Sequence, residues 1–573
     1  EKKYFWNKNL SSEISYQNGE LNGPYKSYYS NGNTYEVGQS LDNFYNGPWK
    51  SYYYDGTLES DFIYDKGYVD GEYKYYDTDG KPYYDYLYRK GEIIEYKYFD
   101  KAGGILSEGR KKGGEFQFTG YHPNGNLLSK GLYNIKGGKE GAWAFFSKNG
   151  VLTSKGTYTE NKIIGDYVTY YKNGEIETKT EYVNDSLSGY YVEYYKNGQL
   201  KRQGWNKDNF AHGEWRSYYM DGTLEIINFY HKDQLHGIQE FYSVEGKLDR
   251  TYKYKFGELI TETYYDNKSN VLGVINYKPE ENNFTLEYVY ENKKTATKID
   301  YVNGIKHGKY LAYDFYGNKA LEGNYVNGEQ NGKWIWYHEN GKIESTRNYL
   351  NGNLNGECID YYEDGAIEAN LFYDYGKSTG TWITYHENGK KARSTEYTND
   401  LMHGRRIFYD NSGKLQLIRF YNHGAIIGYS YLDEDSKELP MIPIKNETAK
   451  IKSYFDNGKV ARDLEYKNGD LVNTYKEYYY SGQIENTMQF VANEYDGNDV
   501  EYYQNGNIRS EHQYQMGVLQ GLTKNYHENG KLKEEIIYRN GERTGEAKYY
   551  NENEKLTKKE FYFNGEIYKS ETY

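Results

Sequence analysis

Histidine is the residue type in this chain best suited to holding a metal ion, and three of its 11 histidines recur in identical turns. His338, His386 and His527 each stand in the sequence YHENGK. The first two are two sequence repeats apart, so four strands at ~4.8 Å each would separate them by roughly 19 Å. His212 and His236, one repeat apart, would still lie about 10 Å from each other. One ion cannot bridge such distances. We therefore predict surface histidines that belong to the repeat, with no metal and no cofactor.

Cys358 is the one cysteine of the chain and its one candidate thiol nucleophile. It occupies the position at which neighbouring copies of the repeat carry Trp334 and Trp382. A residue that replaces tryptophan on an apolar face is expected to be a small packed side chain rather than an activated thiolate. Recurring carboxylates such as Glu344 and Glu368 are expected on a solvated face, because a glycosidase-like pair needs a pocket.

Glycine pairs at 103–104 and 113–114 lack the lysine-serine ending and the following helix that a phosphate-binding loop needs. With no nucleophile, metal cluster or phosphate loop indicated, we predict that the chain is not an enzyme. The rival hypothesis is a surface hydrolase hidden in an irregular segment. A ligand-sized pocket lined by Asp, Glu or His within 91–120, 255–300 or 428–450 would favour that rival.

Composition excludes several classes of partner. The 71 basic and 84 acidic residues give a net charge of −13 without long runs of like charge, so neither nucleic acid nor an anionic membrane is expected to bind. No apolar run is long enough to span a bilayer. The 77 tyrosines suit strands that are half exposed, because tyrosine buries its ring and leaves its hydroxyl in water. The scarcity of cysteine is compatible with export, and a first residue other than Met favours a removed signal peptide.

The unit that must position these residues is clearest in 332–356, GKWIWYHENGKIESTRNYLNGNLNG. Asn340-Gly341 tolerates positive φ at both central positions of a type I′ turn and lies between two runs of strand-forming residues, which predicts a β-hairpin with Trp336 opposite Ser345. Segment 350–355 is expected to connect to the next hairpin. One face would be apolar, with Trp334, Trp336, His338, Ile343, Ser345, Arg347 and Tyr349. The other would be polar, with Ile335, Tyr337, Glu339, Lys342, Glu344, Thr346 and Asn348.

Copies of this unit follow one another at a step of 24 residues, for example at Gly308, Gly332, Gly356, Gly380 and Gly404. We predict one continuous array over 1–573. Its regular blocks are 16–90, 121–254, 301–427 and 451–573, and its irregular segments are 91–120, 255–300 and 428–450. About 23 hairpins are expected. The predicted fold is all-β: an elongated single-layer antiparallel sheet of tandem hairpins, twisted into a rod or superhelix on the order of 200 Å long.

The pattern G-x-[WY]-x-x-Y-Y-x-N-G-x-[LI]-x(5)-Y resembles the bacterial variant of the MORN repeat. It recurs with the same offsets in GEWRSYYMDGTLEIINFY (213–230) and GTWITYHENGKKARSTEY (380–397), and it covers nearly the whole chain. Proteins with such repeats are often labelled as YwqK-type antitoxins. The resemblance implies a row of hairpins in a single-layered sheet. Scaffolding is the role that better-studied MORN proteins suggest, with lipid binding proposed for some. Here the His-Gly pair of their motif is kept at few positions, among them His212, His236, His307 and His403, so lipid binding is not expected.

These observations predict a non-enzymatic scaffold that binds another protein or a second copy of itself, at the cell surface or elsewhere outside the cytoplasm, as a subunit of a larger envelope complex. The alternatives are a cytoplasmic antitoxin or immunity protein, a glycan-binding surface protein and the hydrolase named above. The candidate interaction surface combines tryptophans of the apolar face, tyrosines of a recurring slot and the apolar segment LPMIPI. Its residues are Trp334, Trp336, Trp382, Tyr337, Tyr361, Tyr385, Leu439, Met441 and Ile442.

Overall fold

The computed structural model describes residues 1–4, 8–29, 32–53, 55–277, 283–290, 292–445 and 447–573. Every regular element within these ranges is a β-strand, and neighbouring strands within each sheet pair antiparallel, so the predicted all-β fold of tandem hairpins is confirmed. Parts of the predicted array lie outside the described residues, including Pro279 and the rest of 278–282 in the second irregular segment. The part of the chain that the structure describes contains no helix able to cross a membrane.

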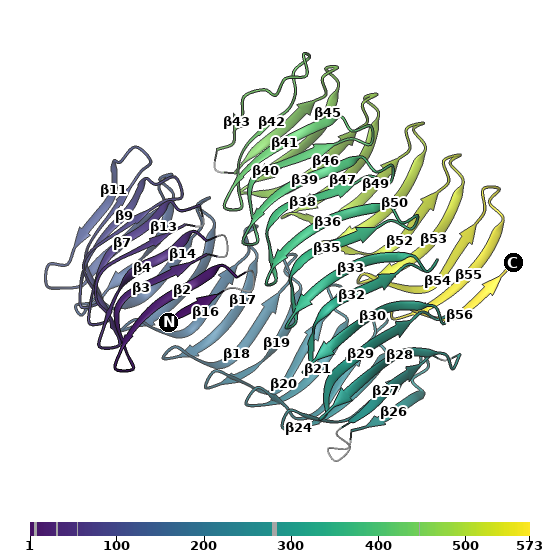
Figure 1. Cartoon of the computed structure of the whole chain (residues 1–573), viewed down its shortest axis with the longest axis horizontal. Helices are drawn as coiled ribbons and strands as arrows, with labels where there is room; N and C mark the ends of the chain where they lie inside the picture. Colours follow the sequence, from purple (N-terminus) through teal and green to yellow (C-terminus); the bar gives the residue numbers. More distant parts are fainter. Residues whose placement is uncertain (5–7, 30–31, 54, 278–282, 291, 446) are drawn as a thin grey trace. The chain divides into compact units, whose positions relative to one another are not determined.

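The described strands form four sheets (Figure 1). The first contains β1 (Lys2–Tyr4), β2 (Leu10–Gln17), β3 (Glu20–Tyr28), β4 (Thr34–Leu41), β5 (Phe44–Tyr45), β6 (Gly47–Tyr52), β7 (Leu58–Asp65), β8 (Tyr68–Tyr76), β9 (Pro82–Arg89), β10 (Glu92–Phe99) and β11 (Ile105–Arg110). The second contains β12 (Phe116–Tyr121), β13 (Leu127–Tyr133), β14 (Lys139–Phe146), β15 (Leu152–Thr159), β16 (Lys162–Tyr170), β17 (Ile176–Val183), β18 (Ser186–Tyr194), β19 (Leu200–Lys207), β20 (Phe210–Tyr218), β21 (Leu224–His231), β22 (Gln234–Leu235), β23 (Gly237–Tyr242), β24 (Leu248–Lys255), β25 (Glu258–Tyr265) and β26 (Val271–Asn276).

The third sheet contains β27 (Asn283–Val289), β28 (Thr295–Val302), β29 (Ile305–Tyr313), β30 (Lys319–Val326), β31 (Glu329–Gln330), β32 (Gly332–Tyr337), β33 (Ile343–Leu350), β34 (Asn353–Leu354), β35 (Gly356–Tyr361), β36 (Ile367–Asp374), β37 (Lys377–Ser378), β38 (Gly380–Tyr385), β39 (Lys391–Thr398), β40 (Leu401–Tyr409), β41 (Leu415–Asn422), β42 (Ala425–Ser430) and β43 (Ile442–Pro443). The fourth contains β44 (Ala449–Tyr454), β45 (Val460–Lys467), β46 (Asp470–Tyr478), β47 (Ile484–Val491), β48 (Glu494–Tyr495), β49 (Gly497–Tyr502), β50 (Ile508–Gln515), β51 (Val518–Leu519), β52 (Gly521–Tyr526), β53 (Leu532–Arg539), β54 (Glu542–Tyr550), β55 (Leu556–Phe563) and β56 (Glu566–Thr572).

The predicted type I′ turn at Asn340-Gly341 is wrong, although the strand register beyond it is right. Trp336 pairs with Ser345 as predicted. In the turn itself the amide of Gly341 donates to the carbonyl of His338 at 2.8 Å, and only Gly341 has a positive φ. This is a three-residue hairpin loop followed by a glycine bulge. A second bulge follows between Ile343 and Ser345, where Glu344 has no cross-strand partner and the pairing shifts by one residue. This shift restores the predicted register.

The type I′ turn lies instead in the segment predicted to be a simple connection. Asn351 and Gly352 both have positive φ, at 48° and 76°, and Leu350 pairs with Asn353. Each sheet therefore alternates two kinds of hairpin. We call the edge with loops such as 338–341 the long-loop edge, and the edge with turns such as 351–352 the short-loop edge.

Indole rings on one face of the sheets form much of the core. Trp49, Trp143, Trp215 and Trp334 are almost fully buried, and each lies flat against a glycine 11 or 12 residues earlier, namely Gly38, Gly131, Gly204 and Gly323. A Cβ at Gly323 would come within 2.1 Å of the Trp334 ring. Glycine is needed at these positions for space, because a side chain there would displace the indole.

The chain divides into two compact units, residues 1–193 with 206–209 and residues 194–205 with 210–573. Within the second unit, long-range hydrogen bonds join the third sheet to the fourth, and three of them show the direction in which the fourth sheet runs. These three link Gln416 Nε2 to the carbonyl of Tyr478 at 3.1 Å, Arg509 to Glu387 at 3.0 Å, and the hydroxyl of Tyr316 to Glu560 at 2.6 Å. Residue numbers fall along one sheet as they rise along the other. The fourth sheet therefore runs back along the third.

The segment LPMIPI lies where this reversal begins. It contains two prolines, which cannot donate to a strand ladder. Even so, Ile442 pairs with Tyr429, and Pro443 pairs with Gly428, in the last strand of the third sheet. A two-residue strand at a sheet edge can include proline because its missing amide faces away from the ladder. Ile444 then enters a buried cluster with residues of the fourth sheet.

Candidate functional site: turn ladders and a groove beside Trp382

The YHENGK turns hold consecutive repeats together. His338 Nε2, Asn340 Nδ2 and Lys342 Nζ reach three carbonyl oxygens of the next long loop, at Tyr361, Glu363 and Asp364, over 2.8–2.9 Å. His386 and His527 repeat the histidine bond to the carbonyls of Tyr409 and Tyr550. These side chains saturate backbone acceptors that would otherwise point into water at the end of a hairpin. The recurring histidines are therefore structural ties between neighbouring loops.

Where a repeat has tyrosine in place of this histidine, the tyrosine hydroxyl also bonds to a carbonyl of the next repeat. The hydroxyls of Tyr29, Tyr53, Tyr195, Tyr219, Tyr362, Tyr479 and Tyr503 each donate to a carbonyl 23 residues further along. Aspartate is too short to reach the next loop and closes its own turn instead. The carboxylate of Asp410, for example, accepts the amide of Lys414 at 2.7 Å.

The His-Gly pairs form a second ladder along the short-loop edge. Nδ1 of His236, His307 and His403 lies 3.2–3.3 Å from the amide of a residue 20 positions later in the next two-residue turn. In the part of the chain that the structure describes, no three His, Cys, Asp or Glu side chains come together in a way that could hold a metal.

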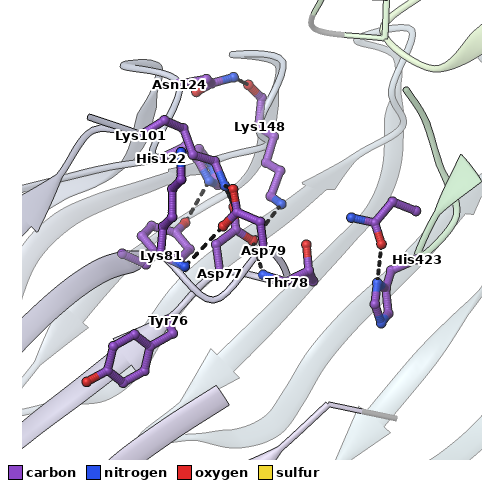
Figure 2. A network of polar contacts seen from close by, with 12 residues as sticks. Tyr76, Asp77, Thr78, Asp79, Lys81, Lys101, His122, Asn124, Lys148 and His423 are labelled. Atoms are coloured by element: carbon purple, nitrogen blue, oxygen red, sulfur yellow. Dashed lines mark hydrogen bonds and ion pairs between the residues drawn. The ribbon is translucent and has the colours of Figure 1, made fainter. Parts of the chain in front are cut away.

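A cluster of charged side chains in the first unit looks like a site but is internally saturated (Figure 2). The buried carboxylate of Asp77 accepts Lys101 Nζ at 2.6 Å and the amide of Thr78 at 2.9 Å, and Lys148 lies 3.5 Å away. Burial disfavours the ionised carboxylate of Asp77, but Lys101 and Lys148 outweigh this effect and hold the pKa of Asp77 below its usual range. His122 is engaged on both ring nitrogens, by the hydroxyl of Tyr83 and the carbonyl of Phe146. The described groups of this cluster thus satisfy one another.

Cys358 is completely buried, and burial raises the pKa of its thiol. A thiol in that state is a poor nucleophile. It fills the slot of the missing indole, as its position in the repeat suggested.

The structure separates the predicted surface residues into three groups, of which the first lies around Trp334. Trp334 is 1% exposed and stacks near Trp336, with ring centroids 6.2 Å apart. Tyr337 is half-buried and its hydroxyl donates to Glu322. Tyr361 is half-buried and contributes the carbonyl that meets His338. Trp334 is thus packing, whereas the other three keep part of their surface in water.

The second group comes from the LPMIPI segment. Met441 is 43% exposed, with its thioether lying over Gly428, while Leu439 and Ile442 are half-buried. The hydroxyl of Ser430 donates to the carbonyl of Leu439 at 2.6 Å, which fixes the segment against β42. Most of this segment covers the end of the sheet, and Met441 is its exposed point.

The third group, Trp382 and Tyr385, lines a groove of about 560 Å³ in the second unit, between β35–β41 and β45–β47. Unlike the four deep indoles, Trp382 is only half-buried. The position 11 residues before it holds Leu371 rather than glycine, so the indole cannot lie flat on the strand. Its Nε1 donates to the carbonyl of Phe372 at 2.9 Å. We call this feature the Trp382 groove.

Charged residues meet in the Trp382 groove without fully neutralising one another. Arg462 is paired with Glu477 at 2.6 Å. Arg393, Glu368 and Glu485 also line the groove, and none of their side chains makes a hydrogen bond or ion pair to another described residue. Burial and the nearby Arg406 lower the pKa of Arg393 to about 10. Burial and the charge of Glu477 raise the pKa of Glu485 to about 7.

Sequence reasoning missed a second exposed surface, on the opposite face from Trp215. Trp205, Phe229 and Ile238 are 51%, 39% and 49% exposed. Phe229 pairs with Glu214, and the Cβ of Phe229 lies beside Gly237, next to Ile238. The sequence did contain a signal for this surface. Trp215 covers Gly204 on one face of the sheet. Trp205 directly follows Gly204 in the strand, so its side chain points to the opposite face. We call these three residues the Trp205 patch.

These features define an all-β protein of tandem hairpins tied loop to loop by recurring side chains. Twelve of its segments match the family model of the MORN repeat variant: 45–66, 69–90, 117–134, 164–184, 187–204, 330–351, 378–399, 402–423, 447–468, 495–516, 519–540 and 543–564. These matches across the chain support a MORN-repeat protein, as the resemblance predicted.

Other comparisons add little. The chain is similar to a protein in "Crystal Structure of TcdB2-TccC3-Cdc42", with 10% identity, a TM-score of 0.13 and coverage of 93% of this chain and 34% of that one. For the Photorhabdus luminescens Tc holotoxin pore the values are 11%, 0.12, 98% and 35%. The chain thus spans about a third of these proteins, and TM-scores this low support no inference. The search of curated proteins gave no match.

Proposed function

We propose that this protein is a non-enzymatic scaffold that binds another protein through the exposed face of its hairpin sheets. The observation that carries the proposal is the Trp205 patch, in which an indole, a phenyl ring and an isoleucine stand in water in neighbouring repeats. Large apolar side chains grouped on a surface are typical of protein-binding sites, and tryptophan is the commonest residue in their energetic centres. Lys253 pairs with Ile238 at one side of the patch, and Glu214 pairs with Phe229 on the strand between those of Trp205 and Phe229, so charged residues lie within and beside the patch.

The absence of catalysis is part of the same proposal. Side chains that could do chemistry, such as His338, Asp77 and Cys358, are engaged by backbone groups, neutralised by lysines or buried. We also propose that the protein acts outside the cytoplasm. This location is supported by a sequence with a single cysteine, which avoids unwanted disulfides in an oxidising compartment. Protease treatment of intact cells that carry the protein would test this location.

A photo-crosslinking amino acid at position 205, used in cells that naturally make the protein, tests the binding surface. We expect one dominant protein crosslink, and we expect Phe229→Ala with Ile238→Ala to remove most of it. Trp382→Ala is the matched control, because it alters a half-buried tryptophan elsewhere in the second unit. If the crosslinks are many and weak, or survive the double substitution while the urea midpoint is unchanged, the patch is not a binding site.

A further inference from the structure

We propose that the Trp382 groove binds a neutral oligosaccharide. This inference is independent of the protein-binding scaffold, since it concerns other strands and another class of ligand. It starts from the shape of the groove. A volume of about 560 Å³ lies within the range of small-ligand sites, roughly 300–1,000 Å³.

The sequence creates this hollow by breaking the packing rule of the repeat beside Trp382. Leu371 stands where a glycine would let Trp382 sink, and both residues line the groove. Ala369 and Thr384, which are cross-strand partners, contribute short side chains where bulkier ones would fill the space. The result is a partly exposed indole beside an open space, with Tyr385 on the same strand.

The polar groups of the groove determine which ligand it suits. The side chain of Arg393 offers donors, while those of Glu368 and Glu485 offer acceptors, and the structure shows no hydrogen bond or ion pair from these three side chains to any described residue. An anionic ligand would meet these carboxylates, and a cationic ligand would meet Arg393. A sugar hydroxyl both donates and accepts, so a neutral polyol can satisfy all three without adding charge to a half-buried site.

An aromatic side chain favours a sugar over other neutral polyols. A pyranose has an apolar face of C–H groups, and the indole of Trp382 offers a flat apolar surface on which such a face can pack. Tyr385, three residues further along the same strand, points to the other face of the sheet, so the indole of Trp382 is the stacking surface. Because the site is an open groove rather than a closed cavity, a chain of several sugars can pass through it with one residue on the indole.

Calorimetric titration of the full chain with cellohexaose, chitohexaose and maltohexaose tests the proposal. We expect saturable binding of at least one, weakened at least about tenfold by Trp382→Ala and largely restored in Trp382→Phe. Glu485→Gln should also weaken it. Trp205→Ala, which removes an exposed indole outside the groove, should leave the affinity unchanged.

The proposal is overturned if none of the three sugars gives a saturable signal at millimolar concentration. It is also overturned if Trp382→Ala binds as tightly as the unaltered chain while its urea midpoint is unchanged. A third contrary outcome is saturable binding of an unrelated neutral peptide that competes with the sugar and equals it in affinity, since the groove would then be a peptide site. Loss of the crosslink at position 205 would leave these measurements unaffected.

Discussion

At the scale of single residues, the fold depends on pairs of a tryptophan and the glycine beneath it. Gly323 has an ordinary strand φ, so its conformation alone would permit other residues. What forbids them is the ring of Trp334, whose atoms lie 2.1–2.5 Å from the site of a Cβ. Close-packed interiors do not absorb such overlap without moving the ring or the strand.

Gly323→Ala should therefore destabilise the array by about 1–3 kcal/mol, through overpacking against Trp334. Gly273 is a matched control, because it also lies in a strand without positive φ and a Cβ added there would have nothing within 4 Å. Gly273→Ala should be neutral or stabilising by up to about 1 kcal/mol. Urea unfolding of both variants measures the difference. Equal midpoints would contradict the role assigned to the glycine.

Glu485 makes stability depend on pH. Burial and the charge of Glu477 raise its pKa to about 7 in the folded chain, against about 4.3 when unfolded. Between these two values the folded state keeps a proton that the unfolded state has released, so stability must fall as pH rises through this window. Asp499, whose pKa burial and Glu501 raise to about 7, contributes in the same direction.

Glu485→Gln removes one of the two titrating carboxyl groups whose protonation differs between the folded and unfolded states. We expect the fall in urea midpoint between about pH 4.5 and pH 7.5 to become shallower in the variant, without vanishing while Asp499 remains. Above pH 7.5 the variant should be the more stable protein. Glu344→Gln, at an exposed position, serves as control. A pH profile that is the same in all three proteins would show that Glu485 is not strained in the folded state.

At the scale of elements, the two hairpin edges use asparagine in different ways. Asn340 on the long-loop edge does not have positive φ. Its side chain donates to the carbonyl of Glu363 and accepts the amide of Lys342. Asn351 on the short-loop edge has φ of 48° and no hydrogen bond from its side chain to a described residue. One asparagine is selected for its amide group, the other for its tolerance of a left-handed backbone.

Replacement by glycine should separate these two roles. Asn340→Gly loses two side-chain hydrogen bonds and should cost about 1–2 kcal/mol. Asn351→Gly keeps a conformation that glycine adopts readily and should be close to neutral. Hydrogen exchange of the amides at 338–342 and 361–366 would report the local opening. A larger effect at Asn351 than at Asn340 would restore the turn assignment that the sequence first suggested.

These two loops also show how far the sequence can be interpreted alone. The step of 24 predicts the strands, and the alternation of side chains predicts Trp336 opposite Ser345. Asn-Gly occurs at both edges, so the dipeptide cannot tell which edge carries the type I′ turn; the number of residues between the strands decides it. The unusual exposure of Trp382 could be predicted from Leu371, which stands where the fully buried indoles have a glycine. That Trp382 shares a groove with Glu485 could not be predicted, because no local pattern encodes the proximity of residues about 100 positions apart.

At the scale of the whole chain, the least predictable feature is the reversal in the second unit at which the fourth sheet meets the third. Arg419 of β41 is 1% exposed there and has no carboxylate partner among the described residues. Its guanidinium donates to the hydroxyls of Tyr466 at 2.9 Å and Tyr475 at 3.1 Å, both in the fourth sheet. The ring of Phe408 lies 4.5 Å from the same guanidinium. A buried charge held only by dipoles and an aromatic ring depends on every one of these partners.

Removing the two hydroxyls should therefore loosen the reversal. Tyr466→Phe with Tyr475→Phe leaves the rings in place but takes both acceptors from Arg419, and we expect a loss of about 2–5 kcal/mol for the pair. Tyr514→Phe is the control, since the Tyr514 hydroxyl bonds to no described residue. Hydrogen exchange should rise first in β41 and β45, while strands of the first unit keep their protection because repeats couple mainly to their neighbours. Uniform loss of protection along the chain would mean instead that the array unfolds as one cooperative body, and the reversal would have no separate stability.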